Sequence, residues 1–271
     1  FSDPEKAFAK ANEIIAFAEK ANNEIWRAEA INLQGVSFGV LGNYAESLTY
    51  FEKSLAIYEE LEYEKGIASS LANIVIIYRN LGNTKKALEA SKRSLKIAER
   101  LGDKIDIAYV KFSIGNIYDE QEEHDKAIDL FEECLATFIE FNDLKGMSGA
   151  YQNLSKIYSL VKKSAKGLEY ANKSLELARK TQNMQQESIV YSIIGNLHLE
   201  QDSLEKALFN FNQCLIISNK MNDDEGKAGS LYSIASVHQK LGNLSKAKKH
   251  ADQSLKIAKD IGSVSVIRDC S

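Results

Sequence analysis

Apolar residues recur along this chain at spacings of three and four, which is the pattern of one helix face. Between Ile67 and Leu81 the apolar positions of this face are Ile67, Leu71, Ile74, Val75 and Tyr78. The turn signal Leu81-Gly82-Asn83 follows, and a second amphipathic stretch runs from Thr84 to about Leu101, before Gly102-Asp103. Glycine ends helices readily because it takes positive φ without strain. The pattern predicts an antiparallel pair, a first helix (helix A) over 67–81 and a second (helix B) over 84–101.

The pair is repeated along the chain with a period of 40 residues. The dipeptide Lys-Ala marks this register, at Lys6-Ala7, Lys86-Ala87, Lys126-Ala127, Lys206-Ala207 and Lys246-Ala247. A second column, eight residues further on, runs from Ile15 to Leu255 and holds leucine or isoleucine throughout. One helix pair cannot bury its apolar face alone, so stacked neighbours must supply the core.

Small and aromatic residues form further columns in the same register. Helix A carries a small residue at Gly35, Gly115, Ser155, Gly195 and Ala235, and an aromatic residue at Phe38, Tyr78, Tyr118 and Tyr158. We expect the small residues to face the small residues of helix B, such as Ala127 and Ala207, where the helices approach closely, and Phe51, Phe131 and Phe211 to fill wider gaps.

These columns resemble the tetratricopeptide repeat. The long period is similar to that of the repeats in kinesin light chains, spindle-orientation adaptors and bacterial peptide receptors or sensors. The resemblance implies an all-α fold, an α-solenoid in which stacked antiparallel helix pairs form a right-handed superhelix. It also implies that helix A lines a concave groove that binds a protein or an extended peptide.

The register predicts one array over residues 1–271. Its parts are an orphan helix B at 3–22, six repeats at 27–66, 67–106, 107–146, 147–186, 187–226 and 227–266, and the start of a truncated seventh repeat at 267–271. Asp3 and Pro4 suit the N-cap and first position of the orphan helix. Because the ends are ragged, we expect a fragment of a longer protein. Glu122, Lys162 and Asp202 replace the turn glycine, so their turns are expected to differ in geometry.

The distribution of charged and apolar residues argues against nucleic acids and membranes as partners. The 34 basic and 38 acidic residues give a net charge of −4 and are interspersed, so no basic stripe suggests nucleic-acid binding. No apolar run reaches the roughly 18 residues that span a bilayer, so membrane insertion is not expected. The sequence predicts a soluble protein, cytoplasmic or, if a signal peptide was removed, periplasmic.

Candidate catalytic chemistry is sparse. The sequence contains no Gly-rich phosphate loop, HExxH or GxSxG motif, which predicts a protein that is not an enzyme and has no cofactor or metal. Cys134 and Cys214 occupy one column two repeats apart and are expected in the core. His198 and His238 could approach a shared metal, but the preferred interpretation is core packing, since they replace the tyrosine of their column. His124 and His250 are expected on the surface.

The resemblance places the binding residues on helix A. The predicted peptide-binding set is Asn73, Arg79, Tyr109, Phe112, Asn116, Gln152, Asn153, Lys156 and Asn196. Asparagine is unfavourable inside helices, so its recurrence there calls for a reason. An amide ladder can hold a peptide backbone, with specificity left to a pocket near Tyr109 and Phe112. Alternatively, the amides bond each other or helix ends between repeats.

Two functions remain open at this stage. The first is a peptide-binding or scaffold module of a larger signalling protein. The second is a regulatory or dimerisation domain of an enzyme, such as a kinase or cyclase, encoded in flanking sequence. In the second case the contacts, including those of a homodimer, would use the convex face or the open ends.

Overall fold

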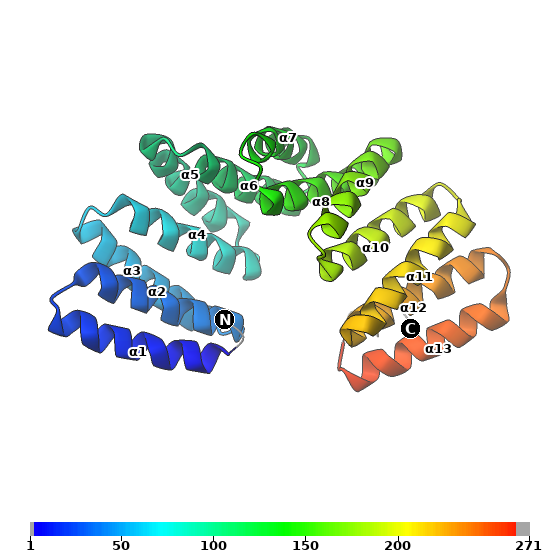
Figure 1. Cartoon of the computed structure of the whole chain (residues 1–271), viewed down its shortest axis with the longest axis horizontal. Helices are drawn as coiled ribbons and strands as arrows, with labels where there is room; N and C mark the ends of the chain where they lie inside the picture. Colours follow the sequence, from blue (N-terminus) through cyan, green and yellow to red (C-terminus); the bar gives the residue numbers. More distant parts are fainter. Residues whose placement is uncertain (1–2, 264–271) are drawn as a thin grey trace. The chain divides into compact units, whose positions relative to one another are not determined.

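The computed structural model describes residues 3–263, and this range folds into thirteen helices without a strand (Figure 1). The helices form two compact units, one ending at Phe141 and the other beginning at Asn142. The expected seventh repeat at 267–271 and Cys270 lie outside the described residues. The fold is therefore all-α, as the periodicity predicted.

Helices of nearly uniform length follow one another through each unit. The first unit contains α1 (Pro4–Lys20), α2 (Glu24–Val40), α3 (Tyr44–Glu60), α4 (Glu64–Asn80), α5 (Thr84–Leu101), α6 (Lys104–Glu120) and α7 (His124–Glu140). The second contains α8 (Leu144–Leu160), α9 (Ser164–Lys180), α10 (Met184–Glu200), α11 (Leu204–Met221), α12 (Asp224–Lys240) and α13 (Leu244–Asp260).

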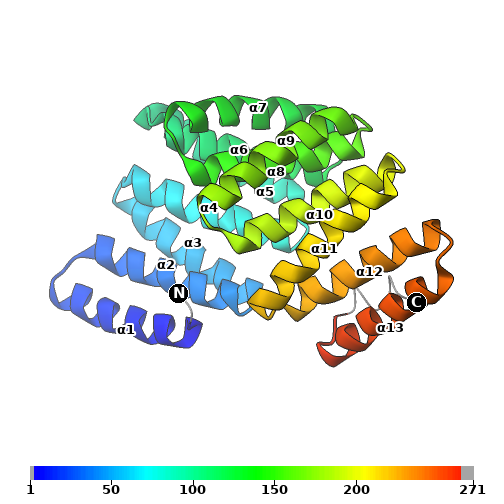
Figure 2. The ribbon, with the colours of Figure 1, turned by 45° about the vertical axis from the view of Figure 1, so that its right-hand side comes forward.

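Helices A and B alternate in both units. Helix A of each predicted repeat is α2, α4 or α6 in the first unit and α8, α10 or α12 in the second, and helix B is the helix that follows. Within each unit every helix packs on the next, and the helices A of neighbouring repeats also meet, as α2 meets α4 and α8 meets α10 (Figure 2). This is the stacking of helix pairs that an α-solenoid requires.

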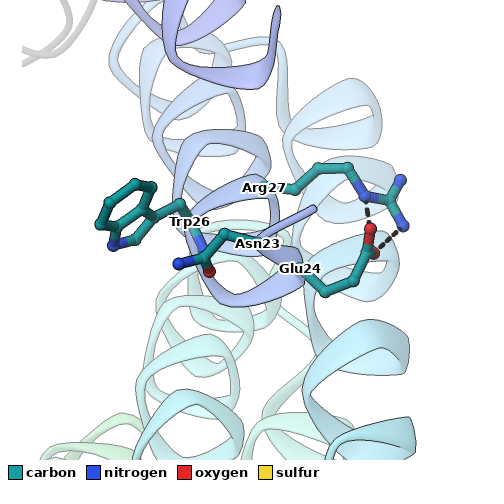
Figure 3. A network of polar contacts seen from close by, with 4 residues as sticks. All are labelled: Asn23, Glu24, Trp26 and Arg27. Carbon is teal, nitrogen blue, oxygen red and sulfur yellow. Dashed lines mark hydrogen bonds and ion pairs between the residues drawn. The ribbon is translucent and has the colours of Figure 1, made fainter. Parts of the chain in front are cut away.

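Side-chain caps begin seven of the thirteen described helices. Asp3 accepts a hydrogen bond from the Lys6 amide at 3.0 Å, with Pro4 at the first position, as the sequence predicted. Asn23 caps α2 by accepting from the Trp26 amide at 3.0 Å. In the same turn Arg27 Nε donates to Glu24 Oε2 at 2.8 Å (Figure 3). Such caps satisfy amides that have no partner inside the helix.

Every described helix is followed by a residue with positive φ, at intervals of twenty residues from Asn22 to Gly262. Lys162 has φ 60° and Gly82 has φ 69°. Both turns also close with the same hydrogen bonds, since the Lys163 amide donates to Tyr158 O and the Asn83 amide to Tyr78 O, each at 2.8 Å.

The prediction that the turns at Glu122, Lys162 and Asp202 differ in geometry is therefore wrong. All three residues take the left-handed conformation, with φ of 60°, 60° and 55°. The helices packed on either side impose the turn, and the local strain of about 1 kcal/mol is too small to change it.

Candidate functional site

In the first unit, side-chain amides of helix A join successive repeats. The Asn32 amide donates to the hydroxyls of Ser70 at 3.0 Å and Ser54 at 3.2 Å. The Asn73 amide donates to Asn32 Oδ1 at 2.8 Å. For this pair the alternative interpretation of the amides applies, because they bond each other between repeats and stabilise the stack.

Charged and polar side chains form further links of this kind. Arg79, predicted to bind a ligand, donates through Nε and Nη2 to Oε1 of Glu120 on α6, at 2.9 and 2.6 Å. In the second unit Gln186 donates to Gln152 Oε1 at 2.7 Å, and Ser159 donates to Glu200 Oε1 at 3.0 Å. Arg79 and Gln152 therefore have structural partners already, and a ligand would have to share them.

A groove of about 490 Å³ lies among α8, α10 and α12, the helices A of the second unit. Two of the predicted residues, Lys156 and Asn196, line it. Its apolar surface includes Leu160, which is 51% exposed, and Ile193. Lys240 adds a second cation to the rim. An exposed amide beside apolar surface and two cations can hold both the backbone and the side chains of an extended chain.

A smaller groove of about 230 Å³ lies between α2 and α4 in the first unit. Asn73 lines it together with Val36, Val40 and Ile76. Val40 and Ile76 are 63% and 51% exposed, so this groove is mainly apolar.

Of the two residues predicted to lie near a pocket, Tyr109 lines one and Phe112 does not. Tyr109 lines a pocket of about 450 Å³ among α4, α5 and α6. Phe112 does not line it, because its ring packs against helix B of its own repeat, 5.1 Å from the Phe131 centroid and 6.1 Å from that of Phe138. Phe112 therefore does not share the pocket of Tyr109, and its role in peptide binding stays a prediction.

Asn116 on α6 and Asn153 on α8 are half-buried, and both already interact with neighbouring groups. Asn116 belongs to the first unit and Asn153 to the second, and their role in binding stays a prediction. Sequence reasoning missed Leu160 and Lys240, which occupy the last position of helix A just before the turn. The available signal was the presence of apolar Val40 and Leu160 in a column that otherwise holds polar residues.

His238 is buried in the core, as expected, whereas His250 differs from the expectation. His250 is half-buried and its ring stacks on that of His238, with centroids 5.6 Å apart, so the surface assignment of His250 is wrong. Burial lowers the pKa of His238, and the nearby His250 and Lys246 lower it further. His124 is also half-buried, with Nδ1 3.3 Å from Asp119 Oδ1.

Residues 3–263 contain neither a cluster of metal ligands nor a helix suited to span a membrane. No group of three or more His, Cys, Asp or Glu side chains there could hold a metal ion. Among the helices described, none combines the length and apolarity needed to cross a bilayer. Cys134 and Cys214 are buried in the core, as predicted.

Models of the tetratricopeptide repeat match residues 26–100 and 66–140, and again 148–181 and 228–261. The chain belongs to the tetratricopeptide repeat family. A comparison with curated proteins gave no match.

Solved structures share the fold at low sequence identity. One is a signal transduction ATPase with numerous domains from Pyrococcus horikoshii that has a tetratricopeptide repeat sensor (TM-score 0.79, 18% identity); the match covers 97% of this chain and 42% of that one. Apo RapI matches with a TM-score of 0.70 and 19% identity, over 95% of this chain and 94% of that one. A Rap protein complexed with Competence and Sporulation Factor has a TM-score of 0.66 and 18% identity, over 90% and 67%. At such identities the likeness shows the fold alone.

Proposed function

We propose that this tetratricopeptide repeat chain is a non-catalytic module that binds a protein or an extended peptide on its helices A, as part of a signalling or scaffold protein. The observation that carries the proposal is the groove among α8, α10 and α12, where Asn196 stands beside the exposed apolar surface of Leu160. The amide of Asn196 offers a donor and an acceptor to a peptide backbone, and the apolar strip can cover side chains.

Two structural neighbours support this choice. The Rap protein is described in complex with Competence and Sporulation Factor, and the Pyrococcus protein uses its repeats as a sensor. The second neighbour also favours the alternative function, a regulatory domain of an enzyme, because the chain spans only 42% of its length.

Selection of peptides from a random display library against the full chain tests the proposal. Selected peptides should bind saturably in fluorescence anisotropy, and Asn196→Ala or Leu160→Ala should weaken binding by about tenfold, as loss of one buried contact predicts. Asn172→Ala, on exposed helix B surface of α9, is the matched control. Both asparagine substitutions raise helix propensity, so neither should unfold the chain.

Binding that survives Asn196→Ala and Leu160→Ala together would contradict the groove assignment. If no peptide binds but the chain alters the activity of an attached kinase or cyclase domain, the regulatory function would replace the binding function.

A further inference from the structure

The pocket among α4, α5 and α6 has an apolar floor that includes Ala68, Ala98 and Val110. It is open because Ala72 stands at the position where the neighbouring helices A carry Asn32 and Phe112. Interiors are otherwise close-packed, so a truncated side chain at this position leaves space for another group.

Ser94 lines this pocket with a hydroxyl that is almost fully buried and unsatisfied. The residue is 2% exposed, and its Oγ has no hydrogen-bond partner among the described residues. Elsewhere in its column Ser54 bonds Ser70, sixteen residues further on, at 2.8 Å, whereas Ser174, with Val190 at that spacing, also has no partner. For Ser94 the corresponding residue is Val110, which cannot do so. A polar group that enters the pocket would satisfy this hydroxyl.

The polar side of the pocket is acidic. Asp103 uses Oδ1 to cap α6, accepting from the amides of Ile105 at 3.0 Å and Asp106 at 3.2 Å. Asp106 forms no ion pair among the described residues. Burial and the repulsion from Asp103 raise the pKa of Asp106, while Lys65 across the pocket opposes them. Asp106 is nevertheless exposed, so its carboxylate is accessible, and an added cation would favour its ionised form.

We propose that this pocket receives an arginine side chain of a bound peptide, an assignment that rests on the peptide-binding function proposed above. The alkyl stem lies on Ala72 and Val110, and the guanidinium pairs with Asp106. Its five N–H donors reach both this carboxylate and the Ser94 hydroxyl, which a single ammonium does less well. Tyr109, whose ring is 5.0 Å from that of Phe138, presents an aromatic surface to the cation.

Titration of the full chain with N-acetyl-arginine amide tests the assignment, with N-acetyl-citrulline amide as the neutral isostere. We expect the arginine probe to shift the backbone amide resonances of Ser94 and Asp106, and the citrulline probe to bind about tenfold more weakly, the loss expected for one charge-assisted hydrogen bond. Asp106→Asn should weaken arginine binding by a similar factor. Lys65→Gln should strengthen it, because a competing cation is removed.

Asp129→Asn, an equal charge change on the exposed surface of α7, is the control and should leave the affinity unchanged. Equal affinity for the two probes, or tighter binding of free arginine than of the capped amide, would overturn the assignment. If selected peptides bind the chain but ignore Asp106→Asn, the pocket assignment fails while the binding function stands. If the arginine probe binds at Ser94 but no peptide binds the chain, the binding function fails instead.

Discussion

At the scale of single residues, the side-chain sizes at two positions sixteen residues apart, one on helix A and one on helix B, depend on each other. Where the first residue is glycine, the second is phenylalanine. A methyl group added at Gly35, Gly115 or Gly195 would lie 2.7, 2.8 or 2.6 Å from the ring of Phe51, Phe131 or Phe211, respectively. In the intervening repeats the first position is larger and the second is Ser91, Ala171 or Ala251. The glycines thus make room for phenylalanine rings. Small residues of helices A and B also face each other, as expected, since the Ser47 hydroxyl donates to Gly35 O at 2.7 Å and the Ser155 hydroxyl to Gly167 O at 2.8 Å.

Gly195→Ala should therefore destabilise the chain by about 1–3 kcal/mol, because the new methyl group forces the Phe211 ring from its position. Gly229→Ala is the matched control in a neighbouring helix, since nothing lies within 4 Å of its added carbon. That control should stabilise by up to about 1 kcal/mol through helix propensity. Urea unfolding curves measure both, and a Gly195→Ala variant as stable as the control would contradict this account of the packing.

His238 gives stability a pH dependence with a defined sign. In the unfolded chain it takes up a proton near its ordinary pKa of 6.5, whereas the folded chain lowers its pKa. Below that pH the unfolded state binds more protons, so stability falls as the pH drops through the window below 6.5. His238→Tyr removes this effect. It introduces the residue found at the equivalent position 158, where Lys166 Nζ lies 5.0 Å from the centroid of the Tyr158 ring. Urea midpoints at pH 7.5 and 5.5 should differ less in the variant than in the wild type.

At the scale of helices and turns, a helix boundary could be predicted where turn residues mark it, but not where only the apolar pattern does. Helix α5 (Thr84–Leu101) was predicted to the residue, because turn residues with strong preferences flank it. Helix α4 begins at Glu64, three residues before the predicted start at Ile67. Its first turn, with Glu64 and Lys65, includes charged residues that add nothing to the apolar pattern.

The turn at Lys162 offers a test of imposed geometry. Because a non-glycine residue with positive φ is strained, Lys162→Gly should stabilise the chain by about 0.5–1 kcal/mol. Gly82→Ala, at the equivalent turn, should cost about 1 kcal/mol from the backbone alone, since nothing lies within 4 Å of the added carbon. Thermal and urea denaturation of the two variants would show opposite shifts; shifts of the same sign would mean that other contacts dominate these turns.

At the scale of the whole molecule, the repeat was visible in the sequence, whereas the site was visible only in part. The columns predict helix A as the binding surface, and Asn73, Tyr109, Lys156 and Asn196 do line grooves. Which amides are already bonded depends on rotamers and on neighbouring repeats, as for Asn32 and Asn73. A single-residue pattern does not carry that information.

A stack of repeats in which each contacts only its neighbours should also open locally. Cys134 in the first unit is buried, and burial raises the pKa of its thiol to about 12. Cys214 in the second unit is 7% exposed, and its Sγ accepts a hydrogen bond from the Ser230 hydroxyl at 3.0 Å. Thiol reagents attack the thiolate, so labelling of either residue requires opening. In chains that retain one of these two cysteines, with Cys270→Ser in both, Gly195→Ala should accelerate labelling of Cys214 by about tenfold. Labelling of Cys134 should change far less, because Gly195 and Phe211 are confined to α10 and α11; equal acceleration would instead mean that the chain opens in one cooperative step.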